Sequence, residues 1–272
     1  HREHVEFPEI KLNGEFENRE LRINYATKRA VSIIVDSDYG KLNLAKTYSI
    51  AEKRISVIPF EPNLEVKKNN ISTRTISDLI AKYKIKNKYI FYPAQFWPHK
   101  NHIYILEAVK ILEMNHKIKI DIVFSGGDKG NKEKIKLFAK KLGIQQRLLF
   151  TGFISNAELI AFYKNSIALV MPTYFGPTNL PPLEALNLGV PVIYSDLNGL
   201  KEQVGDAALF MDLNQPSTLS NHLLNLIKNN DLKNNLIRLG YRIAEKNKNY
   251  DRIAILEKIL ISFISKYSNF KN

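Results

Sequence analysis

Short apolar runs alternate with amphipathic segments along most of the chain. The runs between residues 89 and 210 hold few polar positions, which is typical of strands buried on both faces of a sheet. We expect strands at residues 89–92, 118–124, 148–150, 168–171, 192–194 and 208–210. We expect helices at residues 75–82, 101–114, 132–142, 157–163 and 182–188. The alternation predicts an α/β fold with a doubly wound parallel sheet.

The flanking segments follow other patterns. Residues 1–14 are polar and loop-like. The next elements are expected to be a helix, a strand, a helix and a strand, at residues 15–30, 30–35, 38–48 and 55–58. The tail from residue 217 predicts helices, the last at residues 250–267. We therefore expect an α/β domain at 1–60, a polar linker at 61–72, a second α/β domain at 73–249 and a C-terminal helix within 250–272.

The composition is that of a folded protein. The 272 residues are 44% hydrophobic and 25% charged, which is enough to bury a core. There is no cysteine, which excludes disulfides, thiolate zinc sites, iron–sulfur clusters and a cysteine nucleophile.

The charge balance is basic, because 40 Lys and Arg residues against 27 Asp and Glu residues give a net charge of +13. Such a charge suits nucleic acid, anionic lipid or a phosphate-bearing ligand. The lysines are interleaved with Asn and Ile at 82–88, 132–141 and 246–248, which favours a solvated surface over a nucleic-acid tail. We therefore expect no nucleic-acid partner.

No segment has the pattern of a membrane span or a secretory leader. The most apolar window, residues 253–264, contains charges and is shorter than the ~20 residues that cross a bilayer. We expect a cytoplasmic protein, with peripheral contact at the inner membrane face through its lysines.

Loops that follow strands are the candidate sites, because ligands bind at the carboxyl ends of parallel strands. The loop after residues 89–92 contains Trp97 and Lys100 directly before a helix. A lysine beside free helix N–H groups makes a site for an anion. The alternative is that Trp97 packs against another domain while Lys100 is solvated.

Two further loops contain glycine. In Phe124-Ser-Gly-Gly-Asp128 the glycines allow the backbone to approach a ligand, although the segment matches neither the Walker nor the dinucleotide fingerprint. After Gly152, the spacing of Ser155 and Glu158 is that of a capping box, which predicts that Glu158 caps a helix. Gly152 and the residues after it can still line a pocket.

A fourth loop leads into a short helix. Pro182 suits the start of this helix, Glu184 falls in its first turn and Gly189 ends it. In the simplest interpretation, Glu184 complements the helix dipole, which is worth ~0.3–1 kcal/mol. The long Gly-, Pro- and Asn-containing loop before it indicates a further role.

The order of these motifs resembles that of the retaining, nucleotide-sugar-dependent glycosyltransferases of family four (group 1). The resemblance extends from about residue 55 to the end of the chain. The matching segments are Lys100-Asn, Ser125-Gly-Gly127, Phe150-Thr-Gly-Phe153, Leu180-Pro-Pro-Leu-Glu-Ala-Leu-Asn-Leu-Gly-Val-Pro-Val-Ile193 and Asn198-Gly-Leu-Lys-Glu-Gln-Val-Gly-Asp-Ala-Ala208. The resemblance implies the two-domain GT-B architecture, with a Rossmann-like C-terminal domain and a partial N-terminal α/β domain.

The resemblance also implies roles for the matching residues. Glu184 would bind the ribose hydroxyls of the donor, since a carboxylate accepts two hydroxyl hydrogen bonds. Lys100 would contact the donor diphosphate and stabilise charge on the departing nucleotide. Phe153 and Ile154 would flank the base. The other residues expected near the donor are Gly126, Gly127 and Leu180.

Two positions depart from the family pattern. Gly176 stands where the family usually has a glutamate near the donor sugar, and Gln95 stands where it usually has an arginine. A neutral amide cannot neutralise a phosphate, so Lys100 would carry more of the charge. We expect the loop of residues 175–179 to contact the sugar through backbone N–H groups and through Thr178 or Asn179.

GT-B enzymes also have an N-terminal domain that supplies most of the acceptor site. Residues 1–60 are expected to be only its last part, so we infer that the chain is a fragment of a larger enzyme. His1 and His4 resemble a loop of the missing half that approaches the donor, and a frayed chain end is the alternative.

The sequence therefore predicts a retaining hexosyltransferase that moves a sugar from a nucleoside-diphosphate sugar to a saccharide or lipid-linked acceptor. We expect no cofactor and no metal, because no Asp-rich motif is present and Lys100 with helix N-termini can replace a cation. The alternatives are a homologue that keeps the fold without turnover, and a non-catalytic nucleotide- or nucleic-acid-binding module.

Overall fold

The computed structural model describes residues 15–63, 66, 72–176 and 179–269, without the side chains of residues 15, 73–75, 80 and 265–269. The chain divides into two compact units. Unit 1 comprises residues 1–60 and 246–272, and unit 2 comprises residues 61–245.

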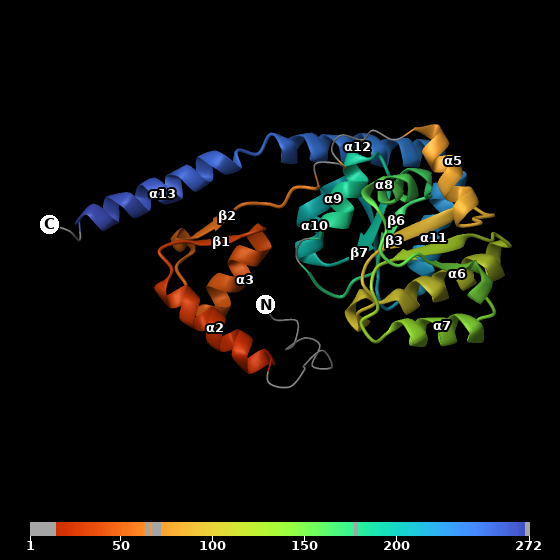
Figure 1. The fold of residues 1–272 in the computed structure, drawn as a ribbon, viewed down its shortest axis with the longest axis horizontal. Coiled ribbons are helices and arrows are strands. Elements are labelled where there is room, and N and C mark those ends of the chain that lie inside the picture. The colour runs from red at the N-terminus through yellow and green to blue at the C-terminus, as the bar shows by residue number, and fades with distance from the viewer. Residues whose placement is uncertain (1–14, 64–65, 67–71, 177–178, 270–272) are drawn as a thin grey trace. The chain divides into compact units, whose positions relative to one another are not determined.

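Unit 2 is built on a six-stranded sheet (Figure 1). Its strands are β3 (Tyr89–Pro93), β4 (Asp121–Ser125), β5 (Leu148–Phe150), β6 (Leu169–Met171), β7 (Val192–Ser195) and β8 (Ala208–Met211). They lie in the order β5-β4-β3-β6-β7-β8, and every neighbouring pair is parallel. The predicted doubly wound parallel sheet is confirmed.

Helices pack on this sheet in groups. The helices of unit 2 are α5 (Thr73–Lys82), α6 (His102–His116), α7 (Lys132–Lys141), α8 (Asn156–Asn165), α9 (Leu180–Asn187), α10 (Asn198–Val204), α11 (Pro216–Lys228) and most of α12 (Asn230–Lys248). Helix α6 packs against α7 and α11, α5 packs against α8, and α9 packs against α10. Every residue of β6 and β7 is buried, as expected for strands covered on both faces.

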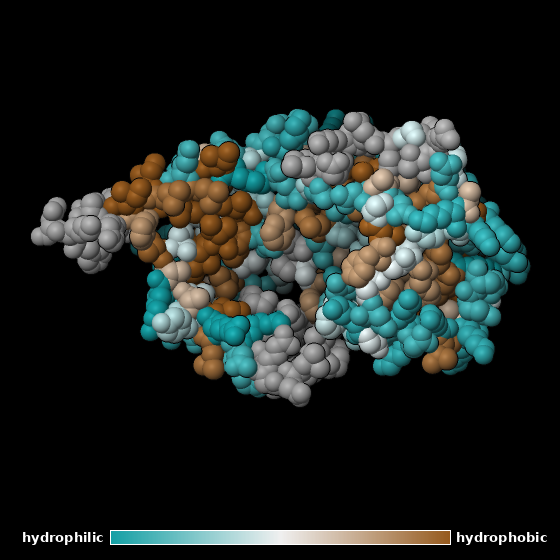
Figure 2. All heavy atoms as spheres, viewed as in Figure 1, coloured by the Kyte–Doolittle hydropathy of each residue, from teal (hydrophilic) through white to brown (hydrophobic). Residues whose placement is uncertain are grey.

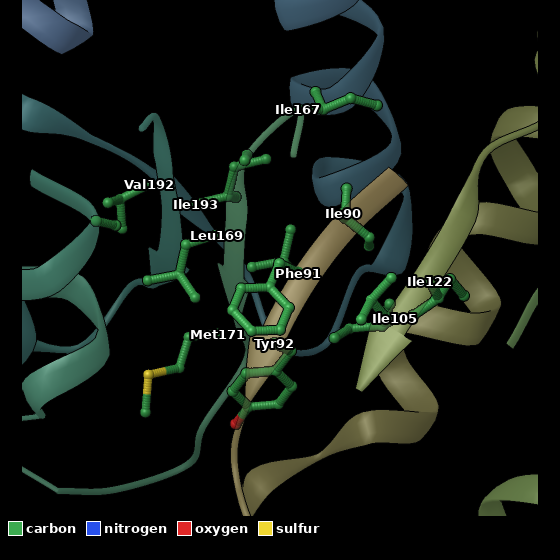
Figure 3. Close-up of a cluster of buried hydrophobic side chains, with 14 of the residues drawn as sticks. Ile90, Phe91, Tyr92, Ile105, Ile122, Ile167, Leu169, Met171, Val192 and Ile193 are labelled. Carbon is green, nitrogen blue, oxygen red and sulfur yellow. The ribbon is translucent and has the colours of Figure 1, made fainter. Parts of the chain in front are cut away.

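The core of unit 2 is centred on β3 and β6, where Phe91 pairs with Leu169 (Figure 3). Two aromatic residues of α8 pack on the ring of Phe91. The ring of Phe162 stacks on it with 5.4 Å between centroids, and the ring of Tyr163 meets it edge-on at 4.9 Å. Each such side chain contributes roughly 1.5–3 kcal/mol through burial, so α8 is held firmly against β3.

Unit 1 is smaller. It contains α2 (Glu15–Arg29), β1 (Ile33–Val35), α3 (Asp38–Tyr48), β2 (Ile55–Val57) and α13 (Arg252–Asn269). Strands β1 and β2 pair in parallel, and Leu44, Ile50 and Ile55 form a small core. The C-terminal segment joins this unit, because Tyr250 Oη donates to Val57 O at 3.2 Å and Arg252 Nε donates to Pro59 O at 2.9 Å.

Helix α13 leaves many of its apolar side chains exposed. Figure 2 shows them within the brown surface of unit 1. They are Ile253, Leu256, Leu260, Ile261, Phe263 and Ile264. Among the described residues, no helix combines the length and the apolar character that crossing a bilayer needs.

Some local details differ from the sequence-based expectations. Helix α9 begins at Leu180 and not at Pro182, so Glu184 lies beyond its first turn. Helix α10 was not expected, because its seven residues show no clear apolar period. Val66, within the expected linker, is buried in the core of unit 2.

Candidate functional site

The strand order reverses between β3 and β6, and we call the region outside the carboxyl ends of these two strands the crevice. The chain moves outward from β3 to β4 and β5, then returns to β6 beside β3 and moves outward on the other side. Ligands of open parallel sheets bind where the order reverses, outside the carboxyl ends of the strands. The loops after β3 and β6 meet there, since Tyr174 N donates to His99 O at 3.0 Å.

Lys100 lies in the loop after β3, at the end of a 3-10 turn formed by Pro98–Lys100. Its backbone oxygen accepts a hydrogen bond from Tyr92 Oη at 3.0 Å, and its Nζ donates to Asn179 Oδ1 at 3.3 Å. The side chain is only partly exposed, and burial lowers its pKa to about 8. Lys100 is therefore not a solvated surface lysine but a poorly hydrated cation at the crevice.

Trp97 lies three residues before this lysine. Its indole Nε1 donates to Gln95 Oε1 at 2.9 Å, and the side chain is partly buried. Gln95 itself is exposed. The two side chains therefore stabilise each other within the loop after β3.

Asn179 is the partner of Lys100, and it is held from several sides. Its Nδ2 donates to Tyr194 Oη at 2.6 Å and to Gly176 O at 3.0 Å. Gln203 Nε2 donates to Asn179 O at 2.6 Å, and Asn179 N donates to Gln203 Oε1 at 3.3 Å. These bonds aim Oδ1 of Asn179 at the lysine. Thr178, the other residue expected to contact the sugar, lies outside the described residues.

Glu184 lies in α9, and its side chain is buried to a relative exposure of 9%. Its Oε2 accepts a hydrogen bond from Tyr163 Oη at 2.8 Å. Burial raises the pKa of Glu184, and this hydrogen bond partly offsets that increase. Burial and the nearby carboxylate raise the pKa of Tyr163 well above its usual value, so its hydroxyl keeps its proton and donates. Glu184 is therefore a buried carboxylate with a fixed orientation. The simplest interpretation of the sequence was a carboxylate that only complements the helix dipole.

The glycine loops form a second group of predicted residues. Gly126 has φ of 144°, and a Cβ there would lie 2.6 Å from Ala94 O. Gly127 O accepts from Phe96 N at 3.0 Å, and a Cβ on Gly127 would lie 3.2 Å from the ring of Phe153. Both glycines therefore permit close packing of the loops after β3, β4 and β5.

Phe153 is the most exposed aromatic side chain of this edge, with a relative exposure of 83%. Ile154 is only partly buried and packs against the core of unit 2. Glu158, further along, closes the expected capping box with Ser155 and also accepts from Lys82 and Tyr83. The prediction that Glu158 caps a helix is confirmed.

The predicted residues thus fall into two groups on the same edge of the sheet. The first group surrounds β3 and β6 and contains Lys100, Gly176, Asn179, Leu180 and Glu184. The second surrounds β3, β4 and β5 and contains Gln95, Gly126, Gly127, Phe153 and Ile154. The loop after β3 belongs to both, since it contains Gln95 and Lys100.

Three polar residues that contact the first group were not anticipated: Tyr163, Tyr194 and Gln203. Tyr194 and Tyr163 are fully buried, and Gln203 lies in the unexpected helix α10. The sequence offers one signal for the two tyrosines. A tyrosine within an otherwise apolar buried run needs a hydrogen-bond partner for its hydroxyl. Within the described part of the chain, no group of three or more His, Cys, Asp or Glu side chains has a metal-binding arrangement.

A family model described as "Glycosyl transferases group 1" matches residues 76–243, which contain both groups of residues. The chain belongs to this family. The predicted resemblance is therefore confirmed at the level of the family.

Curated relatives of this member of the group 1 family include two O-antigen chain mannosyltransferases. The chain is 23% identical over 218 residues to the O-antigen chain mannosyltransferase B of Escherichia coli, and the match covers 80% of this chain and 57% of the relative. It is 26% identical over 190 residues to the O-antigen chain mannosyltransferase RfbU of Salmonella typhimurium, covering 70% of this chain and 49% of the relative. The chain thus spans about half the length of these relatives.

Solved structures share the fold of this chain. Anabaena Alr3699/HepE, crystallised with UDP and glucose, superposes with a TM-score of 0.77 at 18% identity, covering 95% of this chain and 68% of that one. WaaG, a glycosyltransferase involved in lipopolysaccharide biosynthesis, superposes with a TM-score of 0.69 at 17% identity, covering 80% and 59%. The predicted GT-B fold class is confirmed.

The close approach at Gly126 generates a stability prediction. Replacing Gly126 by Ala combines a strained positive φ with an overlap on a backbone oxygen, so we expect a loss of about 3 kcal/mol in the free energy of unfolding. Gly130→Ala is the matched control, because φ is 86° there and no atom lies within 4 Å of the added Cβ. The control should lose about 1 kcal/mol. Equal losses in urea denaturation would contradict the packing role of Gly126.

Proposed function

We propose that this chain is the nucleotide-sugar-binding part of a glycosyltransferase that transfers a sugar to a saccharide or lipid-linked acceptor. Family membership supports transfer from an activated sugar. The names of the mannosyltransferase relatives support a hexose donor, and the UDP bound by a structural neighbour supports a nucleoside-diphosphate leaving group. The observation that carries the proposal is the poorly hydrated Lys100 held by Asn179 at the crevice.

Lys100 would bind the donor diphosphate. Its ammonium has lost hydration without gaining a carboxylate partner among the described residues, so an incoming diphosphate restores favourable interactions. During transfer, the bond between the anomeric carbon and the diphosphate oxygen breaks and a bond to the acceptor oxygen forms. The electron pair leaves with the diphosphate, the proton of the acceptor hydroxyl passes to the departing diphosphate, and Lys100 stabilises the growing charge. We propose that this lysine replaces an obligatory metal.

Glu184 would hold the ribose. Tyr163 fixes one carboxylate oxygen with a 2.8 Å hydrogen bond, so the carboxylate is oriented before the nucleotide arrives. Its remaining acceptor sites suit the two ribose hydroxyls. The exposed ring of Phe153 would support the base, with Ile154 beside it.

The donor sugar would contact the loop around Gly176 and Asn179. Gly176 brings no carboxylate to the sugar, and its backbone oxygen already accepts from Asn179. We propose that Asn179 orients both the loop and Lys100, and that Gln95 donates to a phosphate oxygen without neutralising it. Retention at the anomeric carbon is proposed from the family resemblance, with positioning and leaving-group stabilisation as the source of rate.

The acceptor and the location of the enzyme follow from the same proposal. A lipid-linked acceptor would place the enzyme at the cytoplasmic face of a membrane. The net charge of +13 supports peripheral contact with anionic lipid there.

Nucleotide titration tests the proposal. We expect saturable binding of UDP or GDP, or of their sugars, by isothermal titration calorimetry. Lys100→Ala and Glu184→Ala should each weaken binding by about 10- to 100-fold, since each removes a charge-assisted hydrogen bond. The matched controls are Glu133→Ala and Lys136→Ala, which break an exposed ion pair on α7.

Two results would contradict the proposal. One is a chain that binds none of these nucleotides, and the other is an equal loss in the α7 controls. Saturable nucleotide binding by a full-length enzyme that never transfers sugar would favour the non-catalytic module instead.

The lowered pKa of Lys100 predicts a pH dependence. Because the diphosphate binds the protonated lysine, affinity should be constant well below pH 8 and fall as the pH rises through the lysine pKa of about 8. Lys100→Arg should remove this decline, because arginine stays protonated. A wild-type affinity that is unchanged from pH 7 to about pH 9.5 would show that Lys100 does not carry the interaction.

A further inference from the structure

A lysine-lined cavity lies at the edge of the sheet opposite the crevice. It belongs to unit 2 and has a volume of about 460 Å³. Residues 85–88 precede β3 and residues 164–167 precede β6, so the cavity lies at the amino ends of these strands. The crevice with Lys100 lies at their carboxyl ends, and a ligand in one site would therefore leave the other accessible.

The charges of this cavity have one sign. Lys86, Lys88, Lys164 and Lys233 line it, and no Asp or Glu is among its lining residues. Within the described part of the chain, the ammonium groups of Lys86, Lys88 and Lys233 make no ion pair. Residues 86–88 and Lys233, which are far apart in the sequence, thus bring three cations without ion pairs to one cavity, and a bound anion would relieve their mutual repulsion.

Several lysines of unit 2 outside the cavity have carboxylate partners. The pairs are Lys82 with Glu158, Lys110 and Lys119 with Glu113, Lys136 with Glu133, and Lys201 with Asp196. These pairs occur on several helices and loops of the unit. The lack of any acidic residue is thus a property of the cavity and not of the whole surface.

Neutral donors and apolar side chains complete the cavity. Asn165 and Asn230 line it, and Asn230 is the first residue of the 19-residue helix α12, whose initial N–H groups favour negative charge. The loop that carries Lys86 and Lys88 is fixed, because Asn87 Nδ2 donates to Asp121 Oδ1 at 3.0 Å. The apolar lining residues are Ile85, Ile167, Leu226 and Ile227.

We propose that this cavity is a second anion site, which binds a phosphorylated small molecule with two or more negative charges. The lysines and asparagines would hold the phosphate groups, and the apolar lining would contact the carbon framework. A volume of about 460 Å³ suits a ligand of this size. The inference does not depend on the proposed transferase activity, because none of its residues belongs to the crevice.

Binding of inorganic pyrophosphate tests the site. The titration uses a Lys100→Ala, Glu184→Ala double variant, in which the crevice no longer competes for the anion. We expect saturable binding with one site per chain. Lys88→Gln with Lys233→Gln in that background should weaken it by at least about tenfold. The matched control is Lys134→Gln with Lys140→Gln, because both of these lysines are exposed on α7.

Phenyl phosphate and inorganic phosphate test the apolar lining in the same background. We expect phenyl phosphate to bind more tightly than inorganic phosphate, and Ile85→Ser to abolish the difference. Equal affinities for the two ligands would overturn the role given to the apolar residues.

Backbone amide NMR shifts of the wild-type chain provide a second readout that needs no variant. Pyrophosphate should shift the amides of residues 86–88 and 230–233 with one saturation curve. The proposal is overturned if pyrophosphate does not bind the double variant, if the α7 control loses as much affinity as the cavity variant, or if these amides do not shift. Lys88→Gln with Lys233→Gln should also leave nucleotide affinity at the crevice unchanged.

Discussion

The adjacency of β3 and β6 is the constraint on which the rest of the site depends. These strands are separated by two complete βα units in the sequence, yet they pair in the middle of the sheet. Their pairing brings the loop with Lys100 beside the loop with Asn179 and makes the 3.3 Å hydrogen bond between them possible. The aromatic packing of α8 on Phe91 stabilises the same pair of strands. The pairing of β3 with β6 therefore determines both the packing of the core and the geometry of the site.

In the proposed function, the partly buried Lys100 and the buried Glu184 both bind the donor. Burial acts in opposite directions on them, lowering the pKa of Lys100 and raising that of Glu184. Each is held by a neutral partner, Asn179 for the lysine and Tyr163 for the glutamate. A neutral partner orients a charge without neutralising it, so the charge stays available for a ligand. Such preorganisation costs folding energy and lowers the cost of binding.

The strands and most helices could be predicted from the sequence, because buried parallel strands leave clear apolar runs. The run at 148–150 corresponds fully to β5, whereas the run at 118–124 begins before β4, whose ladder starts at Asp121. Ile120 is buried without taking part in that ladder, and apolarity alone cannot separate the two cases. Helix α10 had no visible signal because its stability comes from the burial of Leu200 and Val204.

Site residues that belong to a sequence motif could be predicted. Contacts that depend on how separate elements pack together could not. Lys100 and Glu184 follow from the family motifs, as does the importance of the glycines. The contact between Tyr163 and Glu184 depends on how α8 lies against α9, and no local pattern encodes it. The hydrogen bonds between Gln203 and Asn179 likewise join helix α10 to the residue before α9. Long-range hydrogen bonds of this kind emerge only from the assembled fold.

A crystal structure of the chain with a bound nucleoside diphosphate tests the central claim most directly. The account predicts ribose hydroxyls within hydrogen-bonding distance of the Glu184 carboxylate and a diphosphate oxygen within 3.5 Å of Lys100 Nζ, in line with ordinary hydrogen-bond lengths of about 2.7–3.2 Å. A nucleotide bound elsewhere, or one at this edge that contacts neither residue, would contradict it.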